Sequence, residues 1–167
     1  MTPQQTSAPA YLAALRARLE ADHCAVSSTH WHGHEVVVGE RTDRKARWLG
    51  SGARIFVHAA AVPVVDEAAL AEFSDWAMAA AGHRISGISV AFDAGLVLPA
   101  LISADVRPAA AQWAAREHRV RGMTVVGRPI AVAVTEHGPR TAMFRGRGVA
   151  KAMFAGHVRD KAALYFP

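Results

Sequence analysis

The chain has 167 residues, of which 51% are hydrophobic and 20% are charged. This composition is typical of a globular domain with an apolar core, and it excludes an intrinsically disordered chain. No apolar run approaches the roughly 18 to 20 residues that a membrane helix needs. Residues 1–9 show neither the basic nor the apolar segment of a secretion signal. We therefore expect a cytoplasmic protein outside the membrane, of bacterial composition.

The charge balance is basic. Nineteen Lys and Arg residues stand against 14 Asp and Glu residues, which gives a formal net charge of +5. Such a balance attracts anions: nucleic acid, phosphorylated ligands or acidic proteins. The single cysteine, Cys24, excludes an intramolecular disulfide framework and a Cys-rich zinc module.

The first elements are a helix and a group of strands. We expect residues 1–9 to be a disordered tail and residues 10–167 to form one domain. A helix over 9–22, begun by Ser7 or Pro9, would pack through Leu12, Leu15 and Leu19. The apolar runs predict strands at 35–39, 46–49 and 54–60, with a charged turn at 40–45.

The middle of the chain predicts a helix and a hairpin. Asp66 is a good N-cap for a helix over 66–81, and Gly82 would end it. Strands at 85–92 and 96–103, with a turn at 93–95, would form a hairpin. Pro99 would then lie at an edge or a bulge, because proline cannot donate to a ladder.

The last third predicts helices on both sides of further strands. Asp105 and Pro108 suit the start of a helix over 105–119. Strands are expected at 123–126, 130–135 and 141–144, and a last helix at 149–166. The fold class that this order favours is α+β: a mostly antiparallel sheet with about four helices packed on one side. A doubly wound α/β fold is the alternative, but no Gly-rich nucleotide fingerprint supports it.

A histidine cluster is the densest group of ligand-type side chains. In an extended strand His30, His32 and His34 would share one face, because the side-chain period is two. Three imidazoles on one face could bind zinc or another divalent transition metal. His23 or Cys24 could add a ligand. The alternative is a polar strand edge with no metal.

Other side chains are candidates for acid–base or nucleophilic chemistry. A histidine titrates near neutral pH, and strand or helix ends often carry functional groups. Cys24 could act as a nucleophile with a nearby histidine, or simply be a small apolar residue. The further acid–base candidates are His58, His83, Asp93, Glu136 and His137.

Three basic runs are candidate anion sites. The run with Gly146 and Gly148 combines a flexible turn, arginines and a following helix N-terminus, all of which favour phosphate. Its pattern is not a P-loop. The alternative is a set of solvated turns. The runs are Arg140, Arg145, Arg147 and Lys151; Arg41, Arg44, Lys45 and Arg47; and Arg116, Arg119 and Arg121.

The tryptophans and the chain end bear on partners. Trp31 and Trp48 could stack on a base or a flat ligand, or could be core or dimer-interface residues, whereas Trp76 and Trp113 are most simply core residues. Exposed strand edges and the apolar ending 164–166 favour a homo-oligomer. The sequence thus favours a binding protein for nucleic acid or a phosphorylated ligand. The alternatives are an enzyme using the histidine cluster and an accessory protein that binds another protein.

Overall fold

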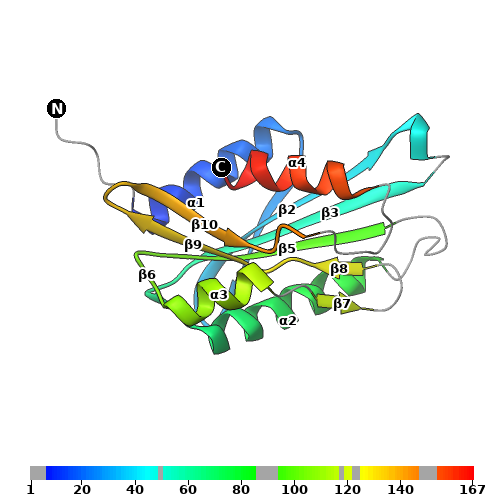
Figure 1. Ribbon diagram of the computed structural model, residues 1–167. Coiled ribbons are helices and arrows are strands. Elements are labelled where there is room, and N and C mark those ends of the chain that lie inside the picture. The colour runs from blue at the N-terminus through cyan, green and yellow to red at the C-terminus, as the bar shows by residue number, and fades with distance from the viewer. Residues whose placement is uncertain (1–6, 49–50, 86–93, 117–118, 122–124, 147–153) are drawn as a thin grey trace.

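The computed structural model describes residues 7–48, 51–85, 94–116, 119–121, 125–146 and 154–167. Within these ranges the chain forms four α-helices and one large sheet of eight strands, most of whose pairings are antiparallel (Figure 1). The predicted α+β class is therefore confirmed.

The helices are α1 (Ala8–Ala21), α2 (Glu67–Ile85), α3 (Pro108–Arg116) and α4 (Ala155–Tyr165). The strands of the large sheet are β1 (Ala25–Trp31), β2 (His34–Arg44), β3 (Gly52–Ala61), β5 (Ala94–Ser103), β7 (Arg119–Arg121), β8 (Val125–Gly127), β9 (Ile130–Thr135) and β10 (Gly138–Met143). The short elements are a 3-10 helix, η1 (Ala46–Trp48), and a two-stranded sheet of β4 (Val64–Val65) and β6 (Asp105–Val106).

The large sheet begins as an antiparallel meander of β1, β2 and β3. Strand β5 lies parallel to β3. On its other side β5 pairs first with β8 and then with β9, both in parallel, while β7 and β10 flank these two antiparallel. Each of the two described edges on the longer strands, β1 and β10, therefore belongs to an antiparallel hairpin.

Helices cover both faces of the sheet. Helices α1 and α4 lie on one face, and α2 and α3 lie on the other (Figure 1). The prediction that all helices lie on one side is wrong. The reason is the composition of the central strands: every residue of β5 is buried, and β3 is buried at most positions on both faces. Strands without a polar face need an apolar layer on each side.

The charged segment 40–45 is mostly strand rather than turn. Strand β2 continues to Arg44, and residues 46–48 form the 3-10 helix instead of a second strand. The charges fit because they have partners: Glu40 binds Arg54 of the neighbouring strand at 2.7 Å, and Arg41 binds Asp43. Trp48 is 1% exposed and packs at 4.7 Å, between ring centroids, against Phe154.

Helix capping follows the sequence at both early helices. The Ser7 hydroxyl accepts a hydrogen bond from Ala10 N at 3.2 Å, and an Asp66 carboxylate oxygen accepts one from Ala69 N at 2.8 Å. Gly82 does not end α2, contrary to expectation. The helix continues to Ile85, which is buried, and Arg84 of its last turn binds Glu40 at 2.7 Å.

The predicted hairpin at 85–103 is only partly within the described residues, because 86–93 lie outside them. Its return strand is β5, a central strand. Pro99 is therefore not at an edge. It lies where β5 changes partner, between the last pairing with β8 at Val97 and the first with β9 at Ala100. Neither Pro99 nor Pro129 has a backbone N–H. The interruption of the ladder therefore leaves no N–H of these two residues without a hydrogen-bond partner.

Helix α3 is shorter than expected, and α4 can be compared with its prediction only in its described part. Helix α3 begins at Pro108, after the short strand β6, and α4 is described from Ala155. The start of the predicted helix at 149 lies outside the described residues, as does most of the predicted tail. None of the described helices is long and apolar enough to cross a membrane.

We expect the α1 face to depend on Leu15, which is fully buried among the residues that α1, α4 and the sheet share. Leu15→Ala should lower the free energy of unfolding by about 2–5 kcal/mol, because it leaves a cavity. Leu164, which is 47% exposed, is the matched control, and its change to alanine should cost less than about 0.5 kcal/mol. Urea unfolding measures both, and equal losses would contradict this packing.

Candidate functional site: a basic end and a buried charge network

The histidine cluster forms the tip of the β1–β2 hairpin. Trp31 pairs with His34, so His32 and Gly33 are the two turn residues. Both have positive φ, 46° and 79°, as a tight hairpin turn of this length requires. The strand alternation that the sequence suggested therefore stops at Trp31.

The three imidazoles do not share a face. His30 pairs with Glu35, whereas His34 pairs with Trp31 one position along the ladder. Adjacent ladder positions point to opposite faces of a sheet. His32 leaves the turn toward α2, where its Nε2 lies 2.7 Å from a Glu72 carboxylate oxygen. The prediction that His30, His32 and His34 lie on one face is wrong, because the chain turns at His32 and Gly33.

Metal ligation finds no support elsewhere in the described ranges. No group of three or more His, Cys, Asp or Glu side chains there is arranged to hold a metal ion. His23 is exposed and has a φ of 60° at the end of α1. His23 therefore has the left-handed backbone conformation that commonly ends a helix. Cys24 instead points toward α4, with its sulfur 3.5 Å from the Tyr165 hydroxyl.

A buried charge network joins α4 to the end of β2. His157 and Asp43 are 6% and 8% exposed, and His157 Nε2 lies 2.6 Å from Asp43 Oδ2. Arg41 binds Asp43 and also Asp22, whose Oδ1 lies 3.2 Å from Arg41 Nη1. Trp48 packs edge-on against the His157 ring at 5.1 Å. Thus one buried ion cluster fixes α4, β2 and the end of α1 together.

The second half of the network centres on Asp22. Its Oδ2 accepts hydrogen bonds from Lys161 Nζ and from the Tyr165 hydroxyl, each at 2.5 Å. Burial raises the pKa of Asp22, but the bonds from Lys161 and Tyr165 outweigh it, so the net shift is downward. Burial and the Asp22 carboxylate raise the pKa of Tyr165 far above its ordinary value. Tyr165 therefore acts here as a hydrogen-bond donor.

The network argues against a nucleophilic role for Cys24. Burial raises the pKa of its thiol, and a smaller effect of the Asp22 carboxylate acts in the same direction. Fewer thiolates at neutral pH mean a weaker nucleophile. This cluster could not be predicted from the sequence, because Asp22, Asp43 and His157 are far apart in the chain. The available signal was His157 beside Phe154 and Val158 on the apolar face of the last helix.

The other acid–base candidates are separate from one another. His58 is 3% exposed on β3, edge-on to Trp76 at 5.8 Å, and no described group bonds its Nδ1. Burial, with a smaller effect of the Arg84 charge, lowers the pKa of His58 to about 4. Glu136 and His137 lie exposed in the β9–β10 turn, 3.4 Å apart. His83 lies in the last turn of α2, and Asp93 is outside the described residues.

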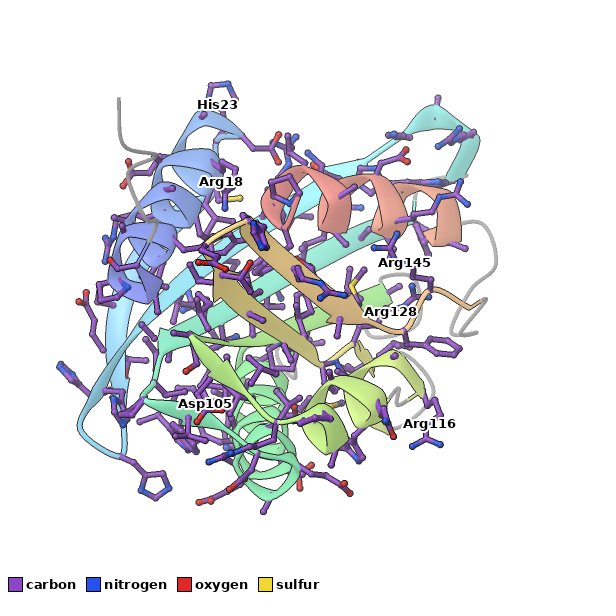
Figure 2. All side chains as sticks on the ribbon, turned by 60° about the vertical axis from the view of Figure 1, so that its left-hand side comes forward. Arg18, His23, Asp105, Arg116, Arg128 and Arg145 are labelled. Atoms are coloured by element: carbon purple, nitrogen blue, oxygen red, sulfur yellow. The ribbon has the colours of Figure 1, made fainter. Side chains whose placement is uncertain are left out.

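The basic runs are partly brought together at one end of the sheet. At this end β2 finishes and β3, β5 and β8 start, as the pairings Arg44 with Gly52, Ala53 with Ala94 and Gly95 with Val125 require. Figure 2 shows Arg116 and Arg145 on one side of the molecule, with Arg128 between them. We call the following exposed side chains the basic end: Arg44, Lys45, Arg47, Arg116 and Arg145.

Two described carboxylates near the basic end, Glu40 and Asp43, have partners of their own. Glu40 binds Arg54 and Arg84, both at 2.7 Å, and Asp43 binds Arg41 and His157. Each of these two carboxylates therefore has an arginine outside the basic end as a partner. Strand β7, which contains Arg119 and Arg121, pairs with β8 at the same end.

Two predicted anion-binding arginines lie elsewhere. Arg41 is part of the buried network. Arg140 pairs with Ala133 on the β9–β10 hairpin, and Ala133 pairs with Ser103 at the opposite end of β5. Arg147 and Lys151 lie outside the described residues. The prediction that Arg140 to Lys151 form one site therefore fails at Arg140.

Arg128, which the sequence analysis did not select, is a buried cation close to Arg145. It is 5% exposed, donates to the Gly146 carbonyl at 3.2 Å and lies 5.8 Å from the centroid of the Phe144 ring. Burial lowers the pKa of its guanidinium. No carboxylate in the described ranges pairs with it, so Arg128 adds positive potential beneath the exposed arginines.

The tryptophans and the chain end are core elements. Trp31 is 9% exposed and packs edge-on against Phe73 at 5.0 Å, and Trp48 is buried beside α4. Neither ring is free to stack on a base. Of the apolar ending, Tyr165 and Phe166 are buried and only Leu164 is exposed.

The fold and site thus define an α+β protein with a basic end. Comparison with known proteins finds no matching family model, no matching curated protein and no matching solved structure.

His58 should make stability depend on pH. Its pKa is about 4 in the fold and roughly 6.5 in the unfolded chain. Below the unfolded value the unfolded chain gains a proton that the fold does not take up, so stability falls as pH drops from about 6.5 toward 4. Integrated over this window the loss is about 3 kcal/mol. Urea unfolding across this range measures it.

The control for His58 is an exposed histidine. His58→Met should flatten the stability curve between about pH 6.5 and 4, whereas His137→Ala should leave it unchanged. If His58→Met retains the wild-type slope, His58 does not remain neutral in the fold.

Asp43 should also make stability depend on pH, but at lower pH than His58. The fold favours the charged form of Asp43, whereas it favours the neutral form of His58. Burial raises the pKa of Asp43, but hydrogen bonds from Arg41 and His157 hold the net value below normal. Its contribution is complete above the unfolded pKa of about 3.9 and is lost as pH falls through the folded value. Asp43→Asn should cost about 3 kcal/mol at pH 7, because it leaves Arg41 and His157 without the carboxylate to which both are bonded.

The matched control is Asp160→Asn, an exposed aspartate on α4. It should change the free energy of unfolding by less than about 0.5 kcal/mol. Equal costs for Asp43→Asn and Asp160→Asn in urea unfolding at pH 7 would contradict the proposed role of the network.

Proposed function

We propose that the protein binds an anionic partner at the basic end, and that this partner is nucleic acid. One observation carries the proposal: arginines and lysines from separate parts of the chain gather at one end of the sheet, while Glu40 and Asp43 nearby are bonded to other arginines. Clustered cations attract a polyanion more strongly than the net charge alone would.

Arginine is well suited to this role. Its guanidinium binds phosphate oxygens in a bidentate manner. Arg116 and Arg145 are exposed, as are Lys45 and Arg47 beside η1. Because Trp31 and Trp48 are buried, base stacking on these rings is not part of the proposal. Backbone phosphates are its targets, so weak dependence on base sequence is expected.

The alternatives have less support. An enzyme built on His30, His32 and His34 loses its geometric basis, since these side chains diverge. A small phosphorylated ligand would use the same cations and is the competing anion. A homo-oligomer remains a proposal that rests on the sheet edges alone, because Tyr165 and Phe166 are buried. A nucleic-acid partner is consistent with our proposal of a cytoplasmic location.

Binding of a labelled oligonucleotide of about 20 nucleotides, followed by fluorescence anisotropy at several salt concentrations, tests the proposal. The logarithm of the affinity should fall linearly with the logarithm of the salt concentration. Lys45→Ala with Arg47→Ala, and Arg116→Ala with Arg145→Ala, should each weaken binding and reduce that slope by about two, roughly one for each lost phosphate contact.

The charge-matched control is Arg107→Ala with Arg140→Ala. It also removes two positive charges, but both lie away from the basic end, so affinity should change little. Equal losses in all three double variants would show that net charge and not the basic end attracts the oligonucleotide. No binding at low salt would overturn the proposal, and competition by inorganic phosphate alone would favour the small phosphorylated ligand.

A further inference from the structure

Strand β10 offers backbone hydrogen-bonding groups at one edge of the sheet. Among the described residues it pairs only with β9. In an antiparallel ladder, alternate residues turn both N–H and C=O away from the partner strand. Pro139 has no N–H, so it suits such an outward position. Thr141 and Met143 lie two and four residues further along and then direct their N–H and C=O groups outward as well.

A groove runs beside this edge. It has a volume of about 400 Å³ and lies between α3 and the hairpin of β9 and β10. Its floor is made of small side chains, including Ala131, Ala133 and Ala142, and Pro108 and Ala111 of α3 form the opposite wall. Since alternate side chains of a strand point to one face, a strand added at β10 would direct every second side chain toward this groove.

One cation lies at the groove. Arg140 is exposed, lines the groove and forms no ion pair with a carboxylate in the described ranges. Thr135 adds a hydroxyl group, which donates a hydrogen bond to the Gly138 carbonyl at 2.7 Å. The groove is therefore apolar at its floor and positive at Arg140.

We infer that the β10 edge and this groove bind an extended peptide segment that carries an acidic side chain. The peptide backbone pairs with β10, its small or branched apolar side chains enter the groove, and its carboxylate binds Arg140. This is recognition by strand addition, in which main-chain bonds provide affinity and pockets for alternate side chains provide specificity.

Charge selects a peptide over a second copy of the chain. Two copies paired through β10 would bring two Arg140 side chains and two Pro139 residues to one interface. Like charges on neighbouring strands repel, and proline at an edge opposes self-pairing. An acidic segment avoids both costs.

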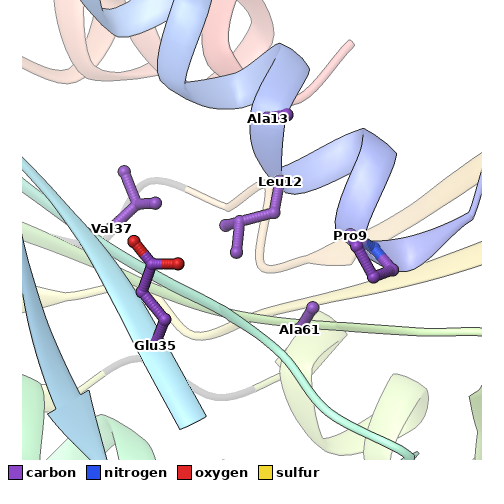
Figure 3. Close-up of a pocket in the computed structure, with 6 residues that line it drawn as sticks. All are labelled: Pro9, Leu12, Ala13, Glu35, Val37 and Ala61. Atoms are coloured by element: carbon purple, nitrogen blue, oxygen red, sulfur yellow. The ribbon is translucent and has the colours of Figure 1, made fainter.

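The other described cavity does not compete for this role. It has a volume of about 260 Å³ and lies between α1 and β2 and β3, lined by Leu12, Val37 and Ala61 (Figure 3). Glu35 supplies its carboxylate, and that carboxylate already accepts hydrogen bonds from Ser28 at 2.8 Å and Arg16 at 3.1 Å.

The test uses fluorescein-labelled peptides of alternating Thr and Val with Asp, Asn or Lys at the centre, titrated with the full chain. The Asp peptide should bind about threefold more tightly than the Asn peptide, and the Lys peptide should bind most weakly. Arg140→Glu should reverse this order. Failure of all three peptides to bind, or an unchanged order in Arg140→Glu, would overturn the inference.

Two further variants test the edge and the groove separately. Thr141→Pro removes an outward donor that β9 does not use, and it should weaken all peptides about fivefold. Ala111→Met places a larger side chain in the groove from α3. It should weaken binding of all three peptides, because their valines enter the groove, while it leaves β10 unchanged. Circular dichroism shows whether Thr141→Pro folds. If it does not, Ala111→Met becomes the test, and unchanged peptide binding in that variant would overturn the groove assignment.

The inference is independent of nucleic-acid binding. Lys45→Ala with Arg47→Ala, which tests the basic end, should bind the Asp peptide as the wild type does. Chemical-shift changes of backbone amides on titration should centre on Thr141 and Met143. Changes centred on β1 instead would place the peptide at the opposite edge and overturn the assignment to β10.

Discussion

The constraint on which the structure depends is that its central strands have no polar face. Strand β5 is buried at every position, and its neighbour β3 is nearly so. A sheet with such a centre must be covered on both faces. Helices α2 and α3 supply one cover and α1 and α4 the other. The candidate sites consequently lie at the sheet ends, at the sheet edges and in the seams between helices.

One of these seams holds α4 in place by an unusual means. The helix packs Phe154, Val158 and Tyr165 into the core, yet His157 and Lys161 extend from the same helix to Asp43 and Asp22. A buried ion pair is weak evidence for stability, because desolvation offsets much of the attraction. Its effect is orientation: two basic side chains of α4 must meet two particular carboxylates, so the helix docks in one position.

The sequence was sufficient for elements whose signal is local. The caps at Ser7 and Asp66 and the apolar run of β3 depend on neighbours in the chain, and the structure has them where they were expected. It was insufficient where the local structure depends on residues that are distant in the chain. The charges of 40–44 suggested a turn because Arg54, the partner of Glu40, belongs to another strand. The three histidines suggested one face because regular alternation was assumed through His32 and Gly33, where the backbone has positive φ. A two-residue turn reverses the chain and separates the imidazoles.

The two long edges of the sheet illustrate how the same backbone geometry can have different consequences. Strand β1 ends in a turn whose His32 contacts Glu72 of α2, and it lines no described cavity, so side chains of its own hairpin and of α2 occupy that end. Strand β10 carries Pro139 and Arg140, two residues that discourage pairing with an identical edge. Beside it, small alanines leave a hollow that neither α3 nor the sheet fills. An edge that only needed protection would be served by the proline and the arginine alone; the adjacent unfilled groove is the feature that protection does not require, and a side chain from an added strand would occupy it.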